Sequence, residues 1–160
     1  EFTPNFPLTR GMFVTCLGRL AGVEGDAAST GYHDLSADHY AAPYAAWAKE
    51  ADIMRGLPDG RFAPDAPITR QELATVLARY AALCGAESGD TGAPVYHDQA
   101  AIADWAKDGV ALCGQLGLLV GSNGTFSPTD TATRAMGAVI LQRLNEADLR
   151  PQPVENGSNI

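Results

Sequence analysis

The chain has 160 residues, 46% of them hydrophobic and 19% charged, and a formal net charge of −8. This composition supplies a packed core, whereas the shortage of cations excludes general binding to nucleic acid or anionic lipid. No apolar run approaches the ~20 residues of a membrane span, so membrane insertion is not predicted. Three cysteines without a CxxC motif argue against a zinc site and predict buried thiols, with a Cys84–Cys113 bond left open.

The sequence contains an internal repeat. A segment running from Phe to Thr-Arg occurs three times, at residues 2–10, 62–70 and 126–134, with offsets of 60 and 64 residues. Upstream of the second and third copies, Tyr32-His33-Asp34 matches Tyr96-His97-Asp98. Matches this numerous in one alignment predict three tandem units.

Each unit is predicted to run helix, glycine-rich turn, extended stretch, helix. The first unit contributes only its second helix, capped by Thr9 and followed by the apolar stripe of Val14, Leu17 and Leu20. The second unit has a helix over about 40–51, with Pro43 in its first turn.

In the second unit a turn at 56–60 precedes a helix capped by Thr69, where Glu72 completes a capping box. The third unit repeats the pattern, with a helix over about 105–116 and a turn at 121–124. Its second helix is capped by Thr133. The phenylalanine after each turn is expected to plug its ring beneath that turn.

The predicted division is residues 1–26 as the C-terminal half of repeat 1, 27–88 as repeat 2, 89–149 as repeat 3, and 150–160 as a flexible tail. We interpret the start of the chain as a cut through repeat 1. Helices this short are only marginally stable without packing partners, so the units must pack on one another. We therefore expect exposed apolar helix surface where the first helix of repeat 1 would pack.

The second unit resembles the S-layer homology (SLH) family most closely, through Gly56-Leu-Pro-Asp-Gly-Arg-Phe-Ala-Pro64 and Thr69-Arg-Gln-Glu72. Tyr32-His-Asp34 and Trp105 extend the resemblance, which covers about residues 2–147. It implies an all-α fold, in which three tandem helix-loop-helix SLH repeats form a pseudo-threefold, three-pronged arrangement around a central helix bundle. The sequence departs from the family where Met12 and Met136 replace the glutamate.

The resemblance also implies a function. Family members are non-catalytic anchoring modules that hold a surface protein on the bacterial cell wall, in the S-layer. Their partner is a secondary cell-wall polysaccharide, often carrying anionic, pyruvylated sugars. The implied location is therefore extracellular, at the bacterial cell surface.

The alternative is a structural protein–protein interaction or self-assembly module of a surface-layer protein. Its partner would be the missing N-terminal part of repeat 1 or another copy of the chain. The sequence contains no Gly-x-Ser-x-Gly, HExxH or phosphate-binding Gly-rich motif. No enzymatic activity, cofactor or metal is therefore predicted.

Arg10, Arg70 and Arg134 are the leading ligand-binding candidates. Each occupies the first position of a predicted helix, where the helix dipole disfavours a cation, so the placement indicates a role other than helix stability. A guanidinium fork fits a carboxylate or phosphate, and nearby backbone N–H groups would add to an anion site. Alternatively, each arginine pairs with an acid and holds two units together.

Glu72, Asp34 and Asp98 complete the predicted ligand-binding set. Both aspartates can accept a sugar hydroxyl, but an aspartate at a helix edge favours a capping role. A second set of arginines lies nine residues after the first, on the opposite helix face, where a structural role is favoured; it comprises Arg19, Arg79 and Arg143. The aromatic residues Tyr40, Trp47 and Trp105 can stack on a sugar, but their helical spacing favours the core.

Overall fold

The structure, a computed structural model, describes residues 3–26, 29–89 and 91–152. Within these ranges the chain forms helices and isolated bridges but no strand, which confirms the all-α prediction. The α-helices are α1 (Arg10–Leu20), α2 (Ala42–Glu50), α3 (Arg70–Leu83), α4 (Lys107–Gln115) and α5 (Arg134–Glu146). Two short 3-10 helices, η1 (Gln99–Ala101) and η2 (Asp104–Ala106), precede α4.

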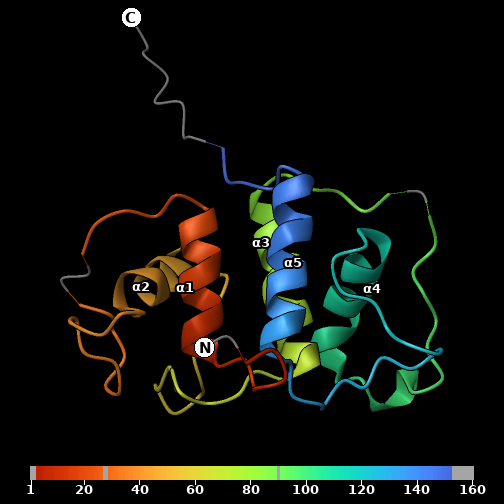
Figure 1. The fold of residues 1–160 in the computed structure, drawn as a ribbon, viewed down its shortest axis with the longest axis horizontal. Helices are drawn as coiled ribbons and strands as arrows, with labels where there is room; N and C mark the ends of the chain where they lie inside the picture. Colours follow the sequence, from red (N-terminus) through yellow and green to blue (C-terminus); the bar gives the residue numbers. More distant parts are fainter. Residues whose placement is uncertain (1–2, 27–28, 90, 153–160) are drawn as a thin grey trace, which may run out of the picture.

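The three helices that begin after a threonine, α1, α3 and α5, occupy the middle of the molecule (Figure 1). Helix α2 packs against α1, and η2 and α4 pack against α3, whereas α1 also contacts α5. A helix from the first half of one predicted repeat therefore covers the second helix of the preceding repeat.

Three extended segments ahead of α1, α3 and α5 meet in a closed ring of backbone hydrogen bonds. The N–H of Leu8 donates to the carbonyl of Ala132 at 2.8 Å, that of Ala132 to Ile68 at 2.9 Å, and that of Ile68 to Leu8 at 2.9 Å. All three side chains are buried. The ring joins parts of the chain that are far apart in sequence and sets where the three helices begin.

The predicted threonine caps are confirmed. The side chains of Thr9, Thr69 and Thr133 each accept a hydrogen bond from the third residue of their helix. Only at α3 is the capping box complete, because Glu72 also accepts from the backbone N–H of Thr69 at 3.3 Å. Met12 and Met136 offer no such acceptor at α1 and α5.

The predicted aromatic plugs are also confirmed. Phe62 and Phe126 are fully buried, and each ring centroid lies 5.3 Å from that of the tyrosine at the start of its repeat, Tyr32 or Tyr96. These contacts join the two ends of each half-repeat.

All three cysteines are free thiols, so the Cys84–Cys113 bond does not form. Cys113 is buried as predicted, and burial raises the pKa of its thiol to about 12, whereas Cys16 and Cys84 are half-buried. Of the predicted flexible tail, residues 153–160 lie outside the described part. The chain just before the tail is held, since the hydroxyl of Tyr80 donates to the carbonyl of Leu149 at 2.9 Å.

Because the hydrogen-bonded ring joins the three repeats, truncating one of its buried side chains should destabilise the fold. Ile68 is fully buried, so Ile68→Ala should lower the free energy of unfolding by about 2–5 kcal/mol in urea denaturation. Val95→Ala is the control: its side chain is 84% exposed, and the change should stay within about 0.5 kcal/mol. Equal effects of the two substitutions would contradict a central role for the ring.

Candidate ligand-binding groove

A hollow of about 410 Å³, here called groove 1, lies between the start of α1 and the side of α3. Three predicted repeats build it: Arg10 comes from the first, Arg55, Glu72, Thr75 and Arg79 from the second, and Trp105 from the third. The volume is in the range of small-molecule sites in proteins.

Arg10 is held rigidly at the end of groove 1. Its Nε donates to the carbonyl of Phe62 at 2.8 Å, and its guanidinium lies 5.3 Å from the centroid of the Phe62 ring. Within the described residues its two terminal nitrogens make no hydrogen bond, and Nη1 lies 3.9 Å from Oε2 of Glu72. Arg10 is 8% exposed, and no buried side-chain nitrogen or oxygen of the described part lacks a partner, so its terminal nitrogens keep a small contact with solvent.

Groove 1 is cationic in an otherwise acidic protein. Three arginines line it against one glutamate. Arg55 is paired with Asp52 at 2.6 Å, whereas the Nη1 of Arg79 donates to the carbonyl of Ile53 at 3.3 Å. Burial, followed by repulsion from Arg55, lowers the pKa of Arg79, and burial lowers the pKa of Arg10. An anion in groove 1 would offset both unfavourable effects.

A second hollow of about 300 Å³, groove 2, lies between the start of α3 and α5. Arg70 and Arg143 line it at the positions of Arg10 and Arg79. The polar Arg55, Glu72 and Thr75 of groove 1 are replaced there by apolar residues, namely Val120, Met136 and Val139.

Arg70 is more fully occupied by the protein than Arg10. Its Nε donates to the carbonyl of Phe126 at 2.7 Å, its Nη2 to that of Val120 at 3.0 Å, and its Nη1 contacts Sδ of Met136 at 3.5 Å. Groove 2 is therefore less polar than groove 1 and leaves its first arginine fewer free donors.

Arg134 faces a third hollow of about 240 Å³ between α1 and α5, lined mainly by apolar side chains such as Phe13 and Leu141. Its Nη1 donates to Oγ1 of Thr3 at 3.1 Å. The structure thus brings Arg10 and Glu72 together but places Arg70 and Arg134 in separate hollows.

The two aspartates hold backbone. Asp34 accepts from the N–H groups of Phe62 and Ala63, both at 2.8 Å, and Asp98 accepts from those of Phe126 and Ser127. The favoured helix-capping role is wrong for Asp98, whose side chain makes no cap hydrogen bond with η1. No described helix begins at Asp34. Both carboxylates instead fix the phenylalanine whose carbonyl receives Arg10 or Arg70.

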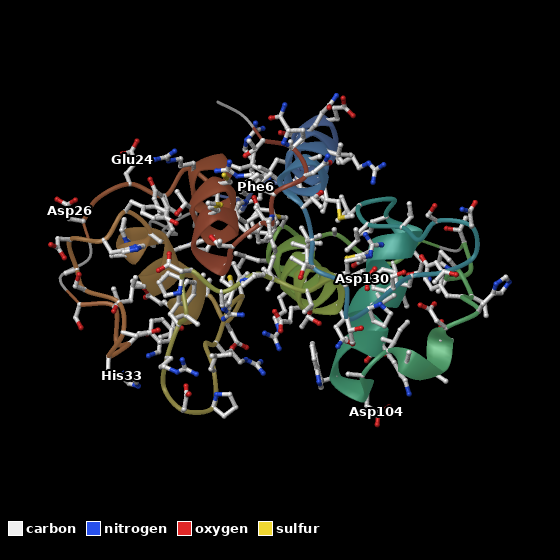
Figure 2. The ribbon with its side chains drawn as sticks, turned by 60° about the horizontal axis from the view of Figure 1, so that its bottom comes forward. Phe6, Glu24, Asp26, His33, Asp104 and Asp130 are labelled. Atoms are coloured by element: carbon white, nitrogen blue, oxygen red, sulfur yellow. The ribbon has the colours of Figure 1, made fainter. Side chains whose placement is uncertain are left out.

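Two of the three aromatic assignments were wrong. Trp105 is 59% exposed and Tyr40 is 50% exposed, so neither is a core residue. Figure 2 shows the neighbouring Asp104 at the outer edge of the molecule, on the short helix η2 that also carries Trp105. Trp47 does pack against the core, with its ring centroid 6.4 Å from that of Tyr80.

The helix starts do not offer free N–H groups to an anion, contrary to expectation. The N–H of Arg10 donates to the carbonyl of Ala66 at 2.9 Å, and that of Gly11 to Pro64 at 2.8 Å. The first two N–H groups of α3 and α5 bond to the neighbouring repeat in the same way. Anion binding in groove 1 therefore rests on side chains.

Sequence reasoning missed the position of Arg79. Nine residues separate it from Arg70, which places the two on opposite faces of α3. Each face, however, borders a different groove, so Arg79 lines groove 1 together with Arg10 of the preceding repeat. Only the packing of one repeat on another reveals this pairing.

The helical half-repeats, joined by the backbone ring, define a tandem-repeat helical module with a cationic groove built by several repeats. A sequence model of the S-layer homology domain matches residues 31–74 and 95–135. The chain belongs to the S-layer homology domain family. Modules of this family are non-catalytic and occur in cell-surface proteins, which implies anchoring to the cell wall.

Several curated proteins align with nearly the whole chain. An amylopullulanase of Thermoanaerobacterium thermosulfurigenes is 35% identical over 91% of this chain but only 8% of its own length. A cellulosome-anchoring protein of Acetivibrio thermocellus is 27% identical over 89% of this chain and 33% of its own length. The S-layer protein sap of Bacillus anthracis is 25% identical over 91% of this chain and 17% of its length. The chain thus spans a third or less of these relatives.

The described residues hold neither a candidate membrane span nor a candidate metal site. None of the helices there is long and apolar enough to cross a bilayer. The same residues contain no group of three or more His, Cys, Asp or Glu side chains that could hold a metal ion.

The aspartate contacts predict a pH dependence of stability. Burial acts to raise the pKa of Asp34, but the hydrogen bonds from Phe62 and Ala63 outweigh it and lower the pKa below its ordinary value. The carboxylate therefore stabilises the fold above that ordinary value, and this contribution is lost as the pH falls through the lowered, folded-state pKa. Asp34→Asn should lower the Tm at pH 7, and the difference from the unsubstituted chain should shrink by pH 3.

Asp65→Asn is the control for this pH series, because Asp65 is exposed and makes no side-chain hydrogen bond with the described residues. It should leave the Tm nearly unchanged at both pH values. A difference for Asp34→Asn that stays constant from pH 7 to pH 3 would contradict the stated role of its carboxylate.

Proposed function

We propose that the chain is a non-catalytic cell-wall anchoring module whose groove 1 binds an anionic, pyruvylated sugar of a secondary cell-wall polysaccharide. The observation that carries the proposal is Arg10, which is fixed through Nε and presents its terminal nitrogens to a cationic groove beside the exposed Trp105. The family and the names of its relatives support attachment at the bacterial surface.

Each part of groove 1 has a chemical task in this proposal. The terminal N–H groups of Arg10 form the donor fork that receives the pyruvyl carboxylate. Arg79, on the facing wall, adds a second positive charge. Trp105 offers an apolar ring face on which a sugar ring stacks, and Glu72 and Thr75 accept hydroxyl hydrogen bonds.

The remaining candidate residues serve differently. We assign Asp34 and Asp98 a positioning role, because their carboxylates hold the backbone that in turn holds Arg10 and Arg70. Arg70 and Arg134 are proposed as weaker contacts, since the protein itself occupies the three guanidinium nitrogens of Arg70 and the hollow at Arg134 is mainly apolar. One groove therefore provides most of the affinity.

The ring at the base of the helices also supports the finer description of the fold. We propose three SLH units with boundaries at residues 26/27, 88/89 and 149/150, arranged with pseudo-threefold symmetry as a three-pronged body around α1, α3 and α5. The equivalent hydrogen bonds of Leu8, Ile68 and Ala132 are the support for this arrangement. The anchored protein's own activity would reside in segments outside this chain.

Retention on purified cell walls tests the function. The protein should cosediment with intact walls, and it should lose most of that binding when the secondary polymer is chemically removed. Depyruvylated walls should behave like stripped walls, because Arg10 and Arg79 would then lack their anion. Equal retention on stripped peptidoglycan would contradict the proposal.

Trp105 provides a test that does not disturb the fold. Substituting Arg10 removes both a structural hydrogen bond and a ligand contact, whereas Trp105 is largely exposed. Trp105→Ala should weaken binding to intact walls about tenfold, equivalent to about 1.4 kcal/mol, with little change in Tm.

Tyr40→Ala is the matched control, since Tyr40 holds the equivalent position in the preceding repeat and is similarly exposed but does not line groove 1. Its affinity for walls should equal that of the unsubstituted chain. An equal loss of affinity in both variants would contradict the proposal that groove 1 is the binding site.

A further inference from the structure

Trp105 is exposed, yet it lies in a short turn that hydrogen bonds fix at both ends. The backbone N–H of Ala106 donates to the carbonyl of Ala103 at 2.9 Å, which closes the turn of η2 around Trp105. The N–H of Ala103 in turn donates to Oε1 of Gln71 at 3.0 Å. Gln71 is the second residue of α3, so its side chain bonds η2 to the helix of the preceding repeat.

The corresponding segment ahead of α2 is held by a side chain of its own. There Nδ1 of His39 accepts from the N–H of Ala41 at 3.1 Å. In the third unit residues 100–103 are all apolar, and Asp104, at the position of His39, pairs with Lys107 instead. The anchor of η2 is therefore supplied from α3.

The second position of the helix also decides where the aromatic side chain can lie. At α1 this position is Gly11, and a Cβ there would lie 3.0 Å from the hydroxyl oxygen of Tyr40, the counterpart of Trp105. Tyr40 thus takes up the space above the start of α1, and it lines none of the three hollows described above. At α3 the Cβ of Gln71 fills the equivalent space, so Trp105 cannot lie there and lines groove 1.

We propose that Gln71 is a positioning residue of groove 1, which holds η2 on α3 and keeps the Trp105 ring at the groove. The inference rests on the proposed function, in which a sugar ring stacks on Trp105. A side chain that is already ordered loses less conformational freedom when a ligand binds, so the anchor raises the affinity without touching the ligand. The anchor is particular to groove 1, because Gly11 and Ala135 hold the equivalent positions in α1 and α5.

NMR relaxation of the indole N–H groups tests the anchor without any saccharide. The chain has two tryptophans, Trp47 and Trp105, and Trp105→Ala identifies their signals. Gln71→Ala removes the acceptor but keeps the Cβ, so the heteronuclear NOE of the Trp105 indole should fall while that of Trp47 stays constant. Gln71→Glu keeps an acceptor oxygen on a side chain of the same length and should preserve the NOE of Trp105.

Wall binding tests the consequence of the anchor. Gln71→Ala should weaken cosedimentation with intact walls about threefold to tenfold, because the Trp105 ring must then be ordered on binding. In the Trp105→Ala background the same substitution should cause no further loss, since its effect passes through that ring. Gln71→Glu should retain the affinity of the unsubstituted chain.

Gln115→Ala is the matched control. Gln115 also bonds a backbone group of the third unit, since its Nε2 donates to the carbonyl of Thr91 at 3.1 Å. It lies at the end of α4, however, and does not line groove 1. Its substitution should change neither the NOE of Trp105 nor the affinity for walls.

An unchanged Trp105 NOE in Gln71→Ala, or an equal fall for both tryptophans, would overturn the inference. Wall binding that Trp105→Ala weakens but Gln71→Ala does not would overturn it as well. If Trp105→Ala has no effect on wall binding, the proposed role of groove 1 fails, and the NOE comparison still decides whether Gln71 orders Trp105.

Discussion

The hydrogen-bonded ring of Leu8, Ile68 and Ala132 is the constraint on which the rest of the structure depends. It brings together three segments that the sequence separates by about sixty residues, and it starts a helix directly after each of them. Because the first two N–H groups of α1, α3 and α5 bond to a neighbouring repeat, no unit can complete the start of its second helix alone. The grooves are a consequence, since each arises where one helix start meets the side of the next helix.

The arginine at the start of α1, α3 and α5 links this frame to the proposed binding site. In groove 1 the Nε of Arg10 is used to hold the neighbouring repeat through Phe62, while the terminal nitrogens stay available. The two interpretations of these arginines, ligand contact and structural link, therefore describe different atoms of one side chain. A guanidinium allows this division because its five N–H donors point in fixed directions. The local cation excess in groove 1 contrasts with the net charge of −8 of the whole chain.

Much of the local structure could be predicted from sequence, because the repeat aligned the elements. The threonine caps, the capping box at Glu72 and the buried Phe62 and Phe126 all follow from short-range patterns. Contacts between segments far apart in the sequence could not be predicted from those patterns. Asp34 bonds residues 28 and 29 positions away, and Trp105 is 59% exposed on η2, although η2 packs on α3 of the preceding repeat. No helical periodicity reveals either feature.

The same limit on sequence-based prediction applies to the surroundings of the three arginines. Sequence placed Arg10, Arg70 and Arg134 in equivalent positions, and the structure keeps that equivalence for the backbone. Their surroundings differ, because the groove walls come from neighbouring repeats in which Glu72 corresponds to Met136 and Arg55 to Val120. Equivalent arginines therefore do not make equivalent sites, and the differences lie in residues that a motif comparison treats as variable.

The central claim, that groove 1 holds the anion through the free end of Arg10, is tested most directly by NMR of the arginine side chains. The guanidinium signals are followed while a pyruvylated fragment of the wall polymer is added, and again with the depyruvylated fragment. The account predicts that the pyruvylated fragment shifts the signals of Arg10 and Arg79 at lower concentration than those of Arg70 and Arg134, and that the depyruvylated fragment does not. Equal shifts at all four arginines, or shifts that do not depend on pyruvylation, would contradict it.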